Sequence, residues 1–219
     1  ILSLSPGPAL LEKAELYKQI ANMWRITDDF WDEWELLHAM FERAEKWSIH
    51  AGAGHFPDAD MLPIGPIRQD IDKNNKTAFT ADEQITMMTL WSIMRSPLII
   101  GGEMTGFDEF TVKLITNEGI LRMHRNSRNA CQIFRRDCEG NEYVAWTASD
   151  SEGGAYLAVF NLGDEDGALV FETEELELSG MTRMGTELWS GQTMELGDQT
   201  RVEIPRHGAK VYYLRGVNA

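Results

Sequence analysis

The stretch that decides the fold reads Trp24-Arg25-Ile26-Thr27-Asp28-Asp29-Phe30-Trp31-Asp32-Glu33-Trp34. An apolar run over residues 20–24 stops at Arg25, which predicts a strand that ends there. Apolar residues then recur at helical spacing and predict a helix over residues 28–46: Phe30, Trp31, Trp34, Leu37, His38, Phe41 and Ala44. In a parallel α/β fold a cleft opens at the carboxyl end of a strand, so this junction is the first candidate site.

Two adjacent carboxylates, Asp28 and Asp29, follow the predicted strand. In one interpretation Thr27 caps the helix and the pair lies in its first turn, where each carboxylate stabilises a helix by about 0.3–1 kcal/mol. Arg25 favours a second interpretation, because a cation beside two carboxylates is costly to bury for structure alone. The same three side chains suit a sugar substrate, because a sugar hydroxyl needs a hydrogen-bond donor and a departing oxygen needs a proton from an acid.

Three segments, in order along the chain, resemble motifs of one known family. They are Trp24-Arg25-x-x-x-Asp29, residues 52–62 (GAGHFPDADML) and residues 90–101 (LWSIMRSPLIIG). They are similar to the acid/base motif, the Asp-Pro-Asp-Met-Leu segment and the last barrel helix and strand of glycoside hydrolase family 27. Members of that family are α-galactosidases and α-N-acetylgalactosaminidases, so the resemblance implies a glycosidase with a carbohydrate substrate and no cofactor.

Strand and helix signals alternate through the first half of the chain. A buried strand is predicted at residues 1–5, before a Pro-Gly-Pro turn and a helical stripe over residues 11–20. A third strand is predicted at residues 47–52, and Thr80-Ala81-Asp82-Glu83 is a capping box that opens the next helix. Pro97 ends that helix, and a fourth strand follows at residues 98–100. The resemblance makes these strands five to eight of a (β/α)8 TIM barrel closed by helices over residues 107–124, so the missing N-terminal half of the barrel is an expected partner.

After Asn126 the pattern changes to short strands separated by turns. Seven runs at spacings typical of an antiparallel sandwich lie at residues 132–134, 143–146, 155–160, 168–171, 187–189, 202–204 and 211–214. Family members carry such a domain behind the barrel. We therefore expect two domains, the C-terminal half of a barrel over residues 1–126 and an antiparallel β-sandwich over residues 127–219.

The resemblance also implies roles for single residues. Asp29 matches the family's acid/base, four residues after the arginine, while Asp28 stays a rival that spacing disfavours. Arg25 matches an arginine that hydrogen-bonds the sugar ring, and Asp60 matches an aspartate of the same pocket. Substrate choice lies at the end of strand five, where this chain has Ala9, with Pro6 and Ser5 before it. The small Ala9 favours N-acetylgalactosamine over galactose, although Pro6 departs from both family patterns.

The family's nucleophile is an aspartate in a Lys-Tyr-Asp type motif, and no such motif occurs in this sequence. A retaining glycosidase needs two carboxyl groups about 5–5.5 Å apart. Our hypothesis is that these 219 residues alone lack hydrolytic activity.

The chain is strongly acidic and has only two cysteines. A net charge of −15 argues against partners such as nucleic acid or anionic membranes, and no apolar run is long enough to span a bilayer. The pairing of Cys131 and Cys138, the cellular compartment and the formation of a homo-oligomer stay open.

The sequence allows two other interpretations. His55, Asp58 and Asp60 could be metal ligands, but a further ligand is lacking, so we expect no metal. A sugar-binding or scaffolding protein is the non-enzymatic alternative, with aromatic residues that core packing explains more simply: Trp146, Trp189, Tyr212 and Tyr213.

Overall fold

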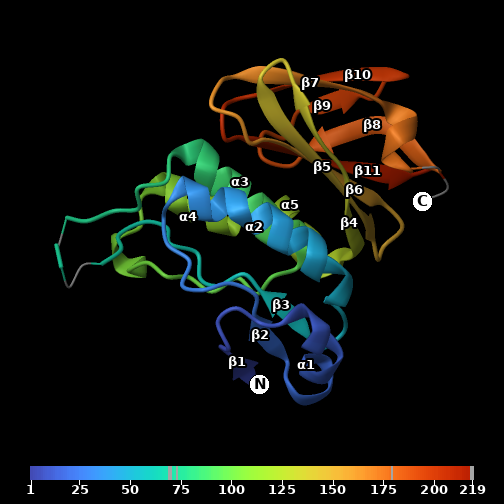
Figure 1. Ribbon diagram of the computed structural model, residues 1–219. Coiled ribbons are helices and arrows are strands. Elements are labelled where there is room, and N and C mark those ends of the chain that lie inside the picture. The colour runs from blue at the N-terminus through green and yellow to red at the C-terminus, as the bar shows by residue number, and fades with distance from the viewer. Residues whose placement is uncertain (69–70, 73, 179, 218–219) are drawn as a thin grey trace. The chain divides into compact units, whose positions relative to one another are not determined.

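The computed structural model describes residues 1–68, 71–72, 74–178 and 180–217 (Figure 1). Contacts divide the chain into two compact units, residues 1–116 and 117–219. Helix α5 (Glu118–Asn126) belongs to the second unit. The boundary expected between residues 126 and 127 stays a prediction.

A parallel sheet of three short strands organises the first unit. Its order is β1 (Ser3–Leu4), β2 (Met23–Arg25) and β3 (Phe56–Asp58), and both pairings are parallel. Arg25 pairs in register with Asp58, so these two side chains start from neighbouring carboxyl ends of the sheet. A further parallel bridge joins Leu62 to Ile100.

Helices connect and follow these strands, as expected of part of a (β/α)8 barrel. They comprise 3-10 turns at Leu11–Lys13, Ser48–His50 and Met104–Gly106, and the α-helices α1 (Ala14–Ile20), α2 (Trp34–Trp47), α3 (Ala81–Met94) and α4 (Glu109–Thr116). Together with the sandwich described below, this arrangement confirms the predicted fold class.

Helix α2 follows the apolar periodicity of the sequence, whereas α3 is buried on all sides from Thr86 to Met94. Helix α2 buries one stripe formed by Leu37, Met40, Phe41, Ala44 and Trp47. The predicted capping box opens α3, because Thr80 Oγ1 accepts the Glu83 N–H at 3.2 Å and Glu83 Oε2 accepts the Thr80 N–H at 2.8 Å. Arg95 ends α3 in the left-handed conformation with φ of 62°.

The predicted start of α2 was wrong. The helix begins at Trp34 with Glu33 as its N-cap, so Thr27 is not a cap and the two aspartates are not in a first turn. Tertiary hydrogen bonds hold the preceding loop out of helical conformation. The Phe30 N–H is bound to Asp60 Oδ2 at 2.8 Å, and Asp32 Oδ2 accepts the Ala78 N–H at 2.5 Å.

Three strand predictions also needed correction. The first strand covers only Ser3–Leu4 and is largely exposed rather than buried. No strand occupies residues 47–52, because the chain turns there and pairs with the sheet only at Phe56–Asp58. In the region expected to hold the fourth strand, the described backbone forms only the single bridge at Ile100.

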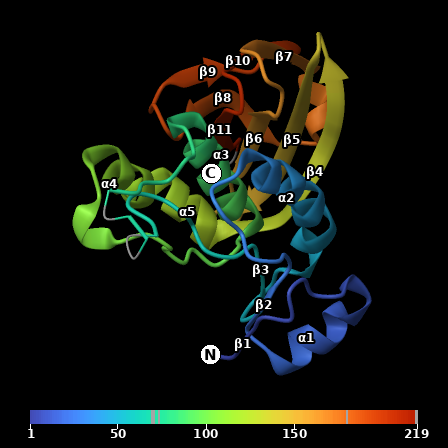
Figure 2. The same cartoon turned by 60° about the vertical axis from the view of Figure 1, so that its left-hand side comes forward.

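The second unit is an antiparallel sandwich. Its strands are β4 (Ser127–Cys138), β5 (Asn141–Asp150), β6 (Ala155–Asn161), β7 (Gly167–Glu172), β8 (Met181–Glu187), β9 (Thr193–Glu195), β10 (Gln199–Ile204) and β11 (Ala209–Gly216). One sheet has the order β4-β5-β6-β11-β8-β9, and the second pairs β10 with β7. The long strands β4 and β5 lie side by side in both views (Figures 1 and 2). The pairings of these strands are all antiparallel, which confirms the predicted sandwich. The sequence missed β9 and most of β8.

Aromatic side chains of the sandwich serve mainly in packing. Trp146 and Tyr212 are buried, and Tyr213 packs against Tyr156 with ring centroids 5.4 Å apart. This burial favours core packing over an exposed sugar-binding platform for Trp146 and Tyr212. Both cysteines are free. Among the described residues, no helix combines the length and apolar character needed to cross a bilayer.

Candidate active site

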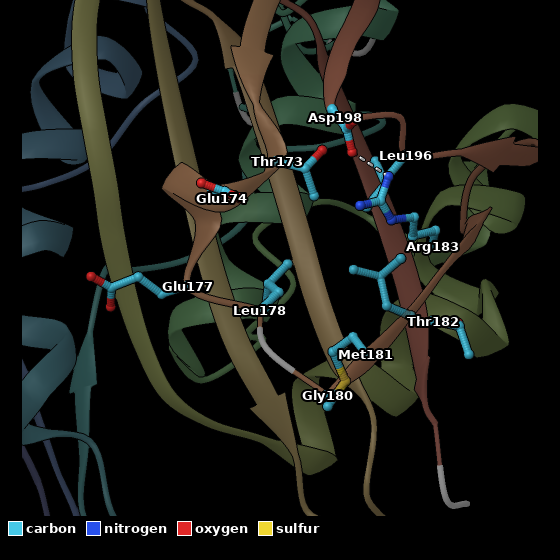
Figure 3. Close-up of a pocket in the computed structure, with 11 residues that line it drawn as sticks. Thr173, Glu174, Glu177, Leu178, Gly180, Met181, Thr182, Arg183, Leu196 and Asp198 are labelled. Carbon is cyan, nitrogen blue, oxygen red and sulfur yellow. Dashed lines mark hydrogen bonds and ion pairs between the residues drawn. The ribbon is translucent and has the colours of Figure 1, made fainter.

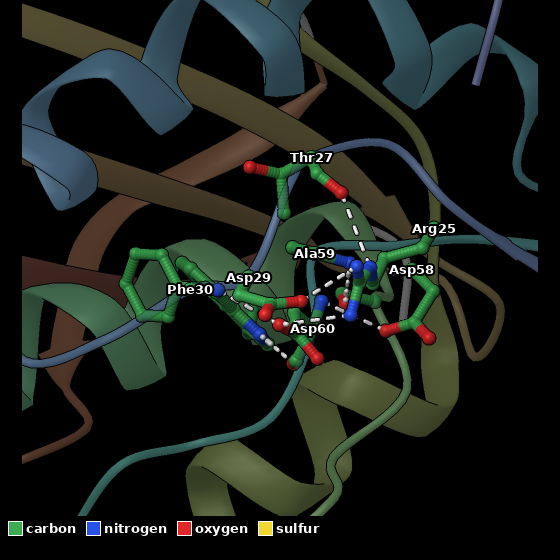
Figure 4. Close-up of polar contacts among 9 residues, drawn as sticks. Arg25, Thr27, Asp29, Phe30, Asp58, Ala59 and Asp60 are labelled. Atoms are coloured by element: carbon green, nitrogen blue, oxygen red, sulfur yellow. Dashed lines mark hydrogen bonds and ion pairs between the residues drawn. The ribbon is translucent and has the colours of Figure 1, made fainter. Parts of the chain in front are cut away.

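The candidate site is built where β2 and β3 end. Arg25 is the last residue of β2, Asp58 is the last residue of β3, and the loops that follow carry Asp29 and Asp60 (Figure 4). The backbone joins the two loops directly, because the Ile26 N–H is bound to the Asp58 carbonyl at 2.9 Å. The three residues that the sequence placed together, Arg25, Asp29 and Asp60, therefore do lie together.

The Arg25 guanidinium is the centre of this cluster. Its Nη2 contacts Asp29 Oδ1 at 2.8 Å, and its Nη1 lies 3.5 Å from Asp60 Oδ2. Its Nε donates to the Thr27 carbonyl at 3.1 Å. Three contacts in different directions hold the planar guanidinium in one orientation, with 19 % of the side chain exposed.

Asp29 is the carboxylate that faces outward. Its side chain is 77 % exposed, yet one oxygen is held by Arg25. Asp28 lies near Gly7, because a Cβ built on that glycine would be 3.6 Å from Asp28 Oδ1. The spacing argument that preferred Asp29 over Asp28 therefore agrees with the position of Arg25.

Asp60 joins the two loops. One oxygen of its carboxylate, Oδ2, accepts the Phe30 N–H, and its carbonyl accepts the Trp91 Nε1–H at 3.0 Å. Its φ is 76°, in the left-handed region that a residue other than glycine adopts only when its surroundings hold it there. Asp60 thus fixes the backbone next to Asp29.

Asp58 lies beneath this turn, and its residue is only 5 % exposed. Its Oδ1 accepts the Asp60 N–H at 2.9 Å, as in an Asx turn. Burial raises the pKa of Asp58 to about 6, and the negative charge of Asp60 acts in the same direction. The hydrogen bond from the Asp60 N–H and the charge of Arg25 oppose that rise in pKa.

Ala9 reaches the site through the backbone. Its N–H donates to the Arg25 carbonyl at 2.9 Å, and the residue is buried. A Cβ built on neighbouring Gly7 would lie 3.4 Å from Arg25 Nη2, and Gly7 has φ of 36°. The loop after β1 therefore passes close to the guanidinium, where a glycine allows the close approach.

The metal interpretation gains no support from the geometry. The His55 ring stacks on Trp24 with centroids 6.4 Å apart, while Asp60 faces Arg25 and Asp58 accepts the Asp60 N–H. In the part of the chain that the structure describes, no cluster of three or more His, Cys, Asp or Glu residues could hold a metal ion.

Supporting residues around the site were not apparent from the sequence. Arg68 forms an ion pair with buried Asp32 and lies over the Trp31 ring at 4.6 Å. Ser96 Oγ accepts the Ala59 N–H at 2.9 Å. These contacts join segments far apart along the chain, and no local pattern signals them.

A separate cavity of about 360 Å³ lies in the second unit (Figure 3). Its polar groups are largely engaged with one another, because Arg183 Nη1 pairs with Asp198 Oδ1 at 2.6 Å and Thr173 Oγ1 donates to the Gly197 carbonyl at 2.5 Å. Since no ring of carboxylates around one guanidinium is found among its described lining residues, we assign the candidate active site to the ends of β2 and β3.

Comparisons with known families match both units. The family model described as alpha galactosidase A matches residues 9–126, and the model of the alpha galactosidase C-terminal beta sandwich domain matches residues 140–214. Among curated proteins, alpha-galactosidase D of Emericella nidulans is 26 % identical over 176 residues, which cover 80 % of this chain and 25 % of that protein.

Solved structures give the same result. A family 27 β-L-arabinopyranosidase from Geobacillus stearothermophilus is 43 % identical, with a TM-score of 0.89 over 99 % of this chain and 50 % of that one. A putative α-N-acetylgalactosaminidase from Bacillus halodurans is 38 % identical, with a TM-score of 0.75 over 87 % of this chain and 44 % of that one. The chain thus spans half or less of the length of these relatives. It belongs to glycoside hydrolase family 27, the family of α-galactosidase A, and corresponds to the C-terminal portion of its members.

Proposed function

We propose that this chain is the C-terminal part of a retaining glycoside hydrolase in which Asp29 is the general acid/base. The observation that carries the proposal is the cluster in which Arg25 contacts both Asp29 and Asp60 at the carboxyl ends of two parallel strands. Family membership supports the reaction class. Arg25 and Asp60 are the proposed sugar-binding residues, and the nucleophile is supplied by a segment outside this chain.

Asp29, which contacts Arg25 in the structure, would act in both steps of the reaction. In the first step it would donate a proton to the departing oxygen while the nucleophile, outside this chain, attacks the anomeric carbon. After the glycosyl-enzyme forms, Asp29 would accept the proton of the attacking water.

The first four strands of the barrel are part of the proposal. In the described part of the chain β1 pairs only with β2, so its other edge is open. Four large apolar side chains in the first part of the chain are about half exposed, namely Leu2, Leu10, Leu16 and Ile20. Their exposure supports burial against the rest of a barrel, since exposed apolar surface favours association.

The proposed substrates carry a terminal sugar with the ring configuration of α-galactose. The named relatives include α-galactosidases, a putative α-N-acetylgalactosaminidase and a β-L-arabinopyranosidase. A β-L-arabinopyranoside has the same ring configuration as an α-D-galactoside but lacks its hydroxymethyl group. One pocket in which Arg25 and Asp60 bind the ring hydroxyls could therefore accept all three sugars. We place the choice among them at the loop that contains Ala9.

The test is hydrolysis of 4-nitrophenyl glycosides of these three sugars by the complete protein. We expect release of nitrophenol from at least one of them and none from the isolated 219-residue chain. The test variant is Asp29→Asn, which removes the proposed acid. Asp28→Asn is the matched control, because it changes the neighbouring carboxylate and keeps that acid. Activity of the isolated chain, or loss of activity only in Asp28→Asn, would overturn the assignment.

A further inference from the structure

A buried carboxyl group beneath the site has no role in the chemistry proposed above. Asp58 is almost fully buried at the end of β3, next to Arg25 in the sheet register. Burying a carboxyl group costs free energy unless hydrogen bonds compensate for the lost water. The contacts of Asp58 with the turn above it indicate what it does.

The turn over residues 58–60 is held by three hydrogen bonds from different elements. Asp58 Oδ1 accepts the Asp60 N–H, Ser96 Oγ accepts the Ala59 N–H, and the Asp60 carbonyl accepts Trp91 Nε1–H. The hydrogen bond accepted by Asp58 comes from the N–H of Asp60, the residue with positive φ. It therefore helps offset the strain of a left-handed aspartate.

That turn determines where the loop of Asp29 lies. Asp60 Oδ2 accepts the Phe30 N–H, one residue after Asp29, and also faces Arg25 Nη1 (Figure 4). Phe30 is buried against Trp91 with ring centroids 5.0 Å apart, so the loop is fixed on both sides of its backbone. A shift of Asp60 would move the carboxylate that faces Arg25, and it would also move the acceptor of the Phe30 N–H that holds the backbone next to Asp29.

We infer that Asp58 is a positioning residue of this site, which sets the place of Asp29 by fixing the turn that carries Asp60. The inference rests on the proposed function of Asp29 and adds a residue to it. Asp58 itself touches neither the sugar nor the departing oxygen in this assignment.

The test compares Asp58→Ala with Asp58→Asn in the complete protein. Alanine removes the acceptor for the Asp60 N–H, whereas asparagine keeps an amide oxygen at that place. We expect kcat to fall about 100-fold in Asp58→Ala and to stay within about threefold of the wild type in Asp58→Asn. The loss should be larger for an alkyl glycoside than for a dinitrophenyl glycoside, because only a poor leaving group depends on the acid.

A matched control distinguishes positioning from general destabilisation. Glu187 is a buried carboxylate of the second unit that accepts the turn N–H groups of Trp189 and Ser190 at 3.2 Å and 2.6 Å. Glu187→Ala should lower stability without changing the leaving-group dependence. Equal losses of kcat on both leaving groups in Asp58→Ala, or no rescue by Asp58→Asn, would overturn the inference.

Hydrogen exchange tests the same inference without activity. In Asp58→Ala, but not in Asp58→Asn, the amides of Asp60 and Phe30 should exchange faster than in the wild type. If the wild type hydrolyses none of the glycosides while these amides respond as expected, the proposed function fails and the structural coupling stands. Unchanged exchange in Asp58→Ala would refute the coupling itself.

Discussion

Replacing Asp58 with asparagine should change how the stability of the protein depends on pH. Burial raises the pKa of this carboxyl to about 6 from an ordinary value of 3.8. The folded protein therefore keeps the proton up to about pH 6, whereas the unfolded chain releases it near pH 3.8. Asp58 contributes stability that is fully present below pH 3.8 and is lost as the pH rises through about 6.

The size of the effect follows from the gap between the two pKa values. At about 1.4 kcal/mol for each pKa unit, the gap corresponds to about 3 kcal/mol. Asparagine does not titrate and keeps an acceptor for the Asp60 N–H, so Asp58→Asn should avoid this loss. Relative to the wild type, the free energy of unfolding of the variant should rise by about 2 kcal/mol between pH 4 and pH 7, since part of the change already occurs below pH 4.

The assay is thermal melting of the complete wild-type protein and the variant from pH 4 to pH 8. The difference between their melting temperatures should grow by several degrees and level off above pH 7. Glu12→Gln, at an exposed position, is the control and should follow the wild-type curve. A constant difference between Asp58→Asn and the wild type over the whole pH range would refute the reasoning.

Three further predictions concern the site and the scaffold. Asp29→Asn in the complete protein should abolish turnover of glycosides with poor leaving groups, measured by steady-state kinetics, but should preserve sugar binding, measured by calorimetry. Loss of sugar binding together with turnover would contradict the acid role. Ala9→Leu should reduce kcat/KM more for an α-N-acetylgalactosaminide than for an α-galactoside, because a larger side chain fills space needed by the acetamido group; equal losses would remove that argument. Thr80→Ala should lower the free energy of unfolding by about 1 kcal/mol through loss of the α3 capping box, with kcat unchanged; a denaturant midpoint equal to that of the wild type would show that the cap contributes nothing.

Local patterns in the sequence determined much of the scaffold. Helical spacing of apolar residues predicted the buried stripe of α2, and the capping box marked the first turn of α3. Both signals depend on neighbours within a few positions, so they survive without knowledge of the fold. Most antiparallel strands of the second unit were found for the same reason, although short β9 and most of β8 were missed.

The family motifs brought Arg25, Asp29 and Asp60 to attention, and the structure places them within contact of one another. Their surroundings were decided only in three dimensions. The sequence favoured a helix over the loop of Asp29. Two long-range hydrogen bonds hold that loop out of helical conformation: the Phe30 N–H donates to the Asp60 carboxylate, and the Ala78 N–H donates to the Asp32 carboxylate.

The burial of Asp58 likewise depends on tertiary structure. The turn above Asp58, with its left-handed Asp60, is held by hydrogen bonds of Ala59 to Ser96 and of Asp60 to Trp91, more than 30 residues away along the chain. Propensity and spacing describe interactions between near neighbours, whereas a carboxyl group acquires a raised pKa only when distant segments exclude water from it. The sequence by itself therefore determined the candidate acid, and the packed chain decided what holds that acid in place.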